Sequence, residues 1–195
     1  MRLKEGNKEK DIIEASIKVF AENGYHKAKI SKIAEVANVA IGSVYVYYKN
    51  KEDLLFRIFE NLWERLYTDF KNLSENTFLS PSEKLDSMID IFFDIFTENP
   101  ALAAVYVNEQ TQLMENGQFR FTEYYEKFLS QAKAIVQEGV DKNIFADNVD
   151  IDIFRYFVFG AIRNLLQQWS VDQNNFPLNK IRQNVKYLAK KGIIK

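Results

Sequence analysis

Residues 24–55 read GYHKAKISKIAEVANVAIGSVYVYYKNKEDLL, and this stretch decides the fold of the N-terminal part of the chain. Its first half has apolar residues at the spacing of one helix face, namely Ile30, Ile33, Ala34 and Ala37. Asn38 then interrupts the pattern, and asparagine tolerates the left-handed backbone that ends many helices. The second half has another apolar set, which fits a helix over residues 40–48: Val39, Val44 and Tyr48. The spacing predicts two short helices joined by a tight turn.

The opposite face of the second predicted helix is smooth and nearly uncharged. It carries Ile41, Gly42, Ser43, Tyr45 and Val46. Small side chains, a bare glycine backbone and tyrosine hydroxyls suit the major groove of DNA, where they can approach bases and phosphates closely. Asn50 lies three residues before Asp53 and predicts the cap of the next helix, whose free N–H groups would face a phosphate together with Lys51.

These features predict a helix-turn-helix that binds double-stranded DNA. Lysines flank the smooth face, and phosphate contacts of this kind position a protein on DNA without reading sequence. The residues expected at the DNA are Lys29, Ser31, Ala40, Ile41, Gly42, Ser43, Tyr45, Tyr47, Tyr48, Lys49 and Lys51.

The first 60 or so residues resemble the DNA-binding domain of the TetR family of bacterial transcriptional regulators. The resemblance rests on Ile13, Ala15, Val19 and Phe20 in an opening helix, then on Gly24-Tyr25, Ile33-Ala34, Ala37, Val39, Gly42, Tyr45, Tyr47-Tyr48, Lys51-Glu52 and Leu54. The chain departs from the usual pattern at Ala28, Asn38 and Ala40-Ile41, where a hydroxyl residue, Gly and Ser-Lys are common. The family implies an all-α repressor whose dimer binds a palindromic operator.

Composition and patterning also predict an all-α protein of two parts. The resemblance implies that these are a three-helix DNA-binding domain at residues 1–50 and a ligand-binding and dimerisation domain at 51–195. Proline follows a capping residue at Ser80-Pro81 and Asn99-Pro100, which is the order of a helix start. The expected helices cover 8–23, 30–37, 40–48, 51–72, 81–97, 100–114, 118–141, 150–172 and 178–191.

The overall net charge of −1 conceals an asymmetry. Residues 1–51 contain ten Lys/Arg and six Asp/Glu, whereas residues 52–195 contain sixteen and twenty-one. The basic end therefore coincides with the predicted DNA-binding end. The chain has no cysteine and no run of 18 apolar residues, so neither disulfides, a membrane span nor a signal peptide is expected, and a cytoplasmic location fits.

The predicted body contains many aromatic residues on long helices. Most such rings simply pack in cores and interfaces, but some could line a pocket for a hydrophobic small molecule. The candidate ligand-binding residues are Phe92, Phe96, Tyr106, Glu109, Tyr124, Tyr125, Phe128, Phe157 and Trp169. An apolar stripe over residues 153–169 is wide enough for both core and dimer contacts, so helices 150–172 and 178–191 are the expected homodimer interface.

This body resembles, more loosely, the TetR-family repressors of fatty-acid degradation, which long-chain acyl-CoA releases from DNA. The resemblance rests on residues 33–55, Asn99-Pro100, Leu102-Ala103, Glu109, residues 159–162 and Trp169. Thr111 stands where those regulators commonly have a basic residue after the glutamate. Arg120, Arg155 or Arg163 could replace that residue.

Enzymatic activity is not expected. His26 is the single histidine, so a histidine-based triad would need that residue, and a two-histidine metal cluster of the helical-bundle type is impossible. Phosphate-binding, dinucleotide-binding, zinc-protease and nucleophile-elbow motifs do not occur, and no catalytic residue, metal or cofactor is predicted. Two alternatives remain: a TetR-type regulator of an efflux pump that responds to drug-like compounds, and a helical lipid-binding or adaptor protein without enzymatic activity.

Overall fold

The computed structural model describes residues 8–115, 119–172 and 174–195, except for several side chains between residues 111 and 124. Within these residues the chain forms nine α-helices and no strand, and a single β-bridge joins Phe145 to Ile194. This confirms the predicted fold class. Among the same residues, no helix has both the length and the apolar character that a bilayer span requires.

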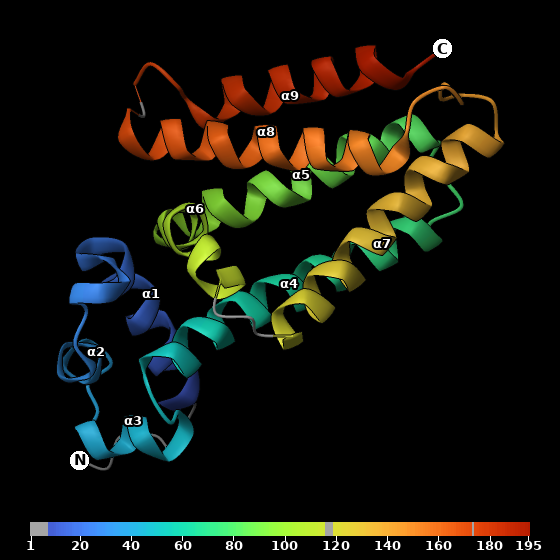
Figure 1. Ribbon diagram of the computed structural model, residues 1–195. Helices are drawn as coiled ribbons and strands as arrows, with labels where there is room; N and C mark the ends of the chain where they lie inside the picture. The colour runs from blue at the N-terminus through green and yellow to red at the C-terminus, as the bar shows by residue number, and fades with distance from the viewer. Residues whose placement is uncertain (1–7, 116–118, 173) are drawn as a thin grey trace.

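Three helices form the head of the molecule (Figure 1). They are α1 (Lys8–Lys27), α2 (Ile30–Val36) and α3 (Ile41–Tyr47). Asn38 lies in the turn between α2 and α3 with φ 55°, as its left-handed tolerance predicts. The predicted first helix ended at residue 23, but α1 continues past Gly24, which bends it with φ 71° and ψ 153°. A residue with a side chain is strained in that conformation, so glycine makes this bend possible.

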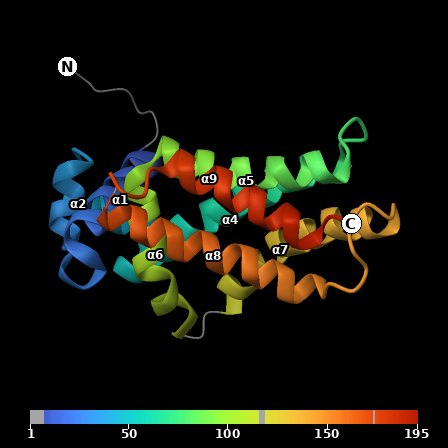
Figure 2. The same ribbon diagram turned by 90° about the horizontal axis from the view of Figure 1, so that it is seen from above.

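Six helices form the body (Figures 1 and 2). They are α4 (Lys51–Glu75), α5 (Pro81–Glu98), α6 (Pro100–Glu115), α7 (Phe119–Asp141), α8 (Ile151–Val171) and α9 (Leu178–Ile193). Helix α4 begins in the head and runs along α7, while α8 and α9 lie together on one side of the body. Helix α6 packs against α1, so head and body share a second contact besides α4.

Side-chain caps fix where several helices begin. The Asn50 side chain accepts a hydrogen bond from the Asp53 N–H at 2.8 Å, and this starts α4 as predicted. Ser80 and Glu83 form a complete capping box ahead of Pro81 at the start of α5. Such caps satisfy N–H groups that have no partner within the helix and stabilise it by about 1 kcal/mol each.

An ionic ladder holds α9 against α5. The carboxylates are Asp86, Asp90 and Asp94 on α5, and the cations are Arg182, Lys186 and Lys190 on α9. Lys190 lies 2.8 Å from Asp86 and Arg182 lies 2.6 Å from Asp94, while Lys186 pairs with Asp90 between them. Because the two helices run in opposite directions, residues spaced four apart on each meet in order.

The α7–α8 corner anchors the end of α9. The Phe145 ring is fully buried beneath Gly139 of α7, where a Cβ atom would overlap the ring. The Ala146 N–H donates to the Ile193 carbonyl at 2.7 Å. The buried ring thus holds the corner on α7, and the hydrogen bond joins the corner to the last turn of α9.

Candidate nucleic-acid interface and effector pocket

Helix α3 presents an apolar face to solvent. Val46 is 77% exposed, Tyr45 54% and Ile41 49%, whereas Val44 on the opposite side is buried. Tyr47 is also exposed and Ser43 half-buried. Apart from half-buried Ser43, the side chains predicted at the DNA on this helix are therefore exposed on its outer surface.

Gly42 is part of the same outward face. A Cβ atom built at this position meets no atom within 4 Å, and the residue has no left-handed backbone. The fold itself therefore does not require glycine here. Glycine even has a cost, because it makes a helix less stable than alanine does by about 0.5–1 kcal/mol. A bare backbone at an exposed site suits close approach by an external partner.

Tyr48 does not belong to this outward face. Its side chain is buried, and its hydroxyl donates to the Glu9 carboxylate at 3.5 Å. Burial first, and then the charge of Glu9, raise the pKa of the phenol. The apolar spacing of Val44 and Tyr48 had indicated the buried side of the helix, and Tyr48 follows that spacing.

The predicted phosphate-binding lysines have two different environments. Lys29 and Lys49 are exposed, as is Ser31 at the start of α2. Lys51 instead donates to the carbonyls of His26 at 3.0 Å and Ala28 at 3.2 Å. At least two of its three N–H bonds are therefore used within the head, and Lys51 ties the start of α4 to the end of α1.

Tyr25 forms the joint between head and body. Its backbone N–H donates to the Glu109 carboxylate of α6 at 3.1 Å, and both residues are buried. Lys51 lies over its ring, 4.6 Å from the centroid. Glu109, predicted to bind ligand, is thus engaged with the backbone just after the bend at Gly24.

Most of the predicted ligand-binding rings pack against one another. Trp63 of α4 stacks on Phe128 at 5.4 Å between centroids and meets Tyr125 at 5.3 Å. Phe96 stacks on Tyr106 at 5.2 Å. The same cluster includes Phe92, which contacts Phe96, Tyr106 and Phe128. These rings pack together as an aromatic core of the body.

The remaining candidates lie elsewhere. Phe157 lies on the surface of α8, where its side chain is 62% exposed. Trp169 is buried nearer the end of the same helix. The Tyr124 side chain lies outside the described residues.

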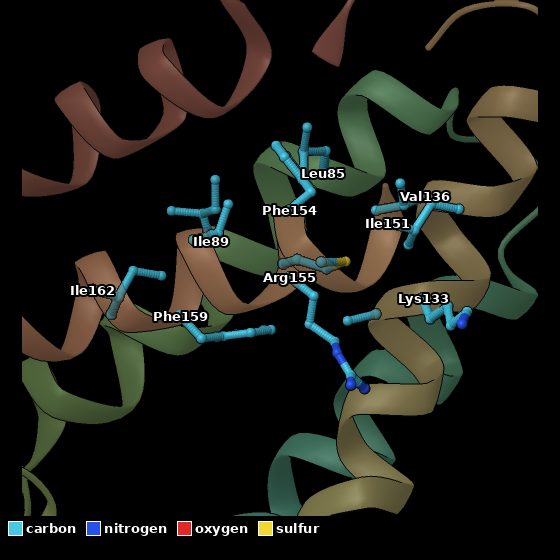
Figure 3. Close-up of a pocket in the computed structure, with 12 residues that line it drawn as sticks. Leu85, Ile89, Lys133, Val136, Ile151, Phe154, Arg155, Phe159 and Ile162 are labelled. Atoms are coloured by element: carbon cyan, nitrogen blue, oxygen red, sulfur yellow. The ribbon is translucent and has the colours of Figure 1, made fainter. Parts of the chain in front are cut away.

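An apolar cavity lies instead between α5, α7 and α8 (Figure 3). Its volume is about 20 Å³, little more than a single water requires. The lining consists of ten apolar and two cationic residues: Leu85, Met88, Ile89, Ala132, Lys133, Val136, Ile151, Phe154, Arg155, Val158, Phe159 and Ile162. Sequence reasoning missed most of them because it weighted aromatic rings, whereas aliphatic residues form most of this lining.

The two cations belong to a charge network beside the cavity. Lys133 lies 2.9 Å from Asp152, and Arg155 lies 3.5 Å from both Asp152 and Glu126. The Arg155 Nε is buried and has no hydrogen-bond partner in the described protein. Phe159 connects the cavity to the aromatic core, since its ring lies 5.1 Å from that of Phe128.

A three-helix head with an exposed recognition helix, joined to a helical body with an apolar pocket, defines a ligand-responsive DNA-binding regulator. Residues 12–58 match the family "Bacterial regulatory proteins, tetR family", and residues 61–192 match "YsiA-like protein, C-terminal region". The Fatty acid metabolism regulator protein of Bacillus subtilis is 31% identical over 186 residues, which cover 93% of each chain. The chain belongs to the TetR family of bacterial transcriptional regulators, as its residues predicted.

Two solved structures are similar over nearly the whole chain. FadR from Bacillus halodurans, a fatty acid degradation regulator, has a TM-score of 0.83 and 29% identity, with 97% of each chain covered. FadR from Bacillus subtilis in complex with stearoyl-CoA has a TM-score of 0.81 and 28% identity, covering 94% of this chain and 98% of the other. The protein is accordingly a ligand-responsive transcriptional repressor rather than an enzyme.

Proposed function

We propose that a hydrophobic small molecule of the long-chain acyl-CoA type releases this repressor from its operator. The supporting observation is an apolar pocket with two cations at its edge, in a chain similar to a FadR solved with stearoyl-CoA. The acyl chain would occupy the apolar space. The negatively charged phosphates of the CoA part would bind Lys133 and Arg155 in place of their carboxylate partners.

The pocket must widen to accept such a ligand. Ligand pockets typically enclose about 300–1,000 Å³, far more than the present cavity. Widening would separate α8 from α5 and α7, whose side chains close the space (Figure 3). Effector binding would therefore select an arrangement of the body different from the closed one.

Operator binding measured with and without effector tests this proposal. Fluorescence anisotropy of a labelled operator at fixed salt should show release by stearoyl-CoA, but not by free CoA or by stearate at the same concentration. Val158→Ile would add one methylene to the closed pocket from α8 and should reduce the response while the protein still binds DNA. Phe78→Trp, at a 95% exposed position between α4 and α5, is the control. Release of the filled variant equal to that of the control would contradict the proposed pocket.

Uncharged aromatic compounds test the efflux-regulator alternative. If such compounds release the protein from the operator and stearoyl-CoA does not, the pocket serves drug-like ligands. An adaptor would show no affinity for DNA at any salt, whereas a repressor loses affinity steeply as salt rises.

A homodimer would bring two heads to one palindromic operator, with recognition helices in successive major grooves about 34–36 Å apart. Exposed apolar side chains on α8 and α9 support this assembly: Ile153, Phe157, Tyr187 and Leu188. Leu188→Glu should give a monomer in light scattering and weaken operator binding. A dimer of unchanged stability would place the interface elsewhere.

Communication between pocket and head would use two connections. Helix α4 packs along α7, which lines the pocket, and continues into the head. Helix α6 contacts α8 through the Arg163 guanidinium, which donates to the Val107 carbonyl at 3.3 Å, and contacts the head through Glu109. Movement of α8 would thus reach the head by both routes. This scheme keeps residues 1–50 as the DNA-binding domain and residues 51–195 as the effector and dimer domain, acting in the cytoplasm.

A further inference from the structure

The outward face of α3 lacks the side chains that usually read guanine or adenine. In the major groove, guanine is read mainly by Arg or Lys and adenine by Asn or Gln, whereas the thymine methyl group is read by apolar contact. Residues 41–47 are IGSVYVY and include none of those four polar types. The exposed aliphatic side chains of this helix are Ile41 and Val46.

Val46 belongs to that exposed face. It is 77% exposed, more than any other large apolar side chain of the head, although a branched apolar residue gains nothing from solvent. Gly42 lies one turn earlier on the same side of the helix, and the space around it is open. An apolar side chain beside bare backbone forms a shallow surface that fits a methyl group at close range.

We propose that this repressor reads thymine methyl groups through Val46 and Ile41. This inference rests on the proposed binding of operator DNA by α3. Each half-site then carries thymine at the positions beneath these two side chains. Discrimination there depends on the C5 methyl group rather than on hydrogen bonds to bases. The hydroxyls of Tyr45 and Tyr47, together with the exposed lysines, are left for phosphate contacts that carry no sequence information.

Replacing thymine with uracil isolates the methyl group, because the base pair and its hydrogen bonds stay the same. A random library of duplexes is first selected with the purified protein, and the enriched operator is synthesised with single thymines replaced by uracil. Anisotropy at fixed salt should show a loss of affinity of about fourfold for each methyl group that is read, which is the factor expected for about 0.8 kcal/mol per buried methyl-sized group. Uracil outside the half-sites should have no effect.

A variant assigns the contact to its side chain. Val46→Ala should bind the thymine operator more weakly and should lose its sensitivity to uracil at one position of each half-site. Phe78→Ala, at an exposed position between α4 and α5, should retain the sensitivity of the original protein. Both positions are exposed, so neither change removes a core contact.

The outcomes separate this inference from the proposed function. If selection enriches no sequence, operator binding itself is refuted, and methyl recognition with it. If an operator is enriched but uracil at every half-site position binds as well as thymine, operator binding stands and methyl recognition is overturned. Equal uracil sensitivity of Val46→Ala and Phe78→Ala overturns the assignment to Val46.

Discussion

Gly42→Ala should change stability and DNA binding in opposite directions. The added methyl group meets no atom of the protein within 4 Å, so it creates no clash in the fold. Alanine in a helix is more stable than glycine by about 0.5–1 kcal/mol, and a position in the first turn should give the lower value. For a protein of this size, about 0.5 kcal/mol raises Tm by about 1–2 °C.

The same methyl group should weaken operator binding, because it would occupy the space where backbone and DNA approach. Adding one carbon to a well-packed contact costs about 1–3 kcal/mol, which corresponds to a loss of about fivefold to a hundredfold. Thermal and urea denaturation would measure the first effect, and anisotropy on the operator at fixed salt the second.

Gly192→Ala provides the control, since this glycine of α9 also has open space around it. It should not destabilise the fold and should leave operator affinity unchanged. If Gly42→Ala binds the operator as tightly as the original protein, the bare backbone does not face DNA and the reasoning about α3 is refuted.

Gly139→Ala should destabilise the protein by about 1–3 kcal/mol in urea denaturation, because its methyl group overlaps a buried ring; unchanged stability would mean that the corner adapts freely. Glu109→Ala leaves a buried N–H of the head unpaired. It should reduce the factor by which effector lowers operator affinity, which operator titrations of the variant with and without effector would measure. An unreduced factor would exclude communication through α6. The hydrogen bonds from Lys142 and Lys84 lower the pKa of Glu138, so the stability they give is complete above about pH 4.5 and is lost as the pH falls through the folded-state pKa. Glu138→Gln should therefore flatten the acid side of the stability profile, and an identical profile would refute this.

Local signals in the sequence predicted local structure well. The start of α5 was predicted from Ser80, Pro81 and Glu83, and the structure has the complete capping box there. Asn38 predicted a left-handed residue in the turn between α2 and α3, and its φ of 55° confirms this. Each of these features depends only on residues within one turn of one another, so the neighbouring sequence is enough to predict it.

Contacts between distant segments were harder to predict. The Lys51 ammonium is paired with carbonyls more than twenty residues away, and Glu109 with a backbone N–H 84 residues away. The spacing of neighbouring residues in the sequence does not indicate either pairing. The cavity was missed for a related reason: Phe92 and Phe128 have the same helical spacing whether they line a space or fill it, and three-dimensional packing decides between the two.

The ladder between α5 and α9 limits how these helices can move. Its charges recur every four residues, about 6 Å along each axis, so the helices can pair only in discrete alignments. A slide of four residues would leave Asp86 and Arg182 without partners in one direction, or Asp94 and Lys190 in the other, and a shorter slide would misalign all three pairs. The ion pairs therefore oppose sliding of α9 along α5, but they do not prevent α9 from tilting. If α9 belongs to the dimer interface, the two subunits should adjust the distance between their heads by pivoting.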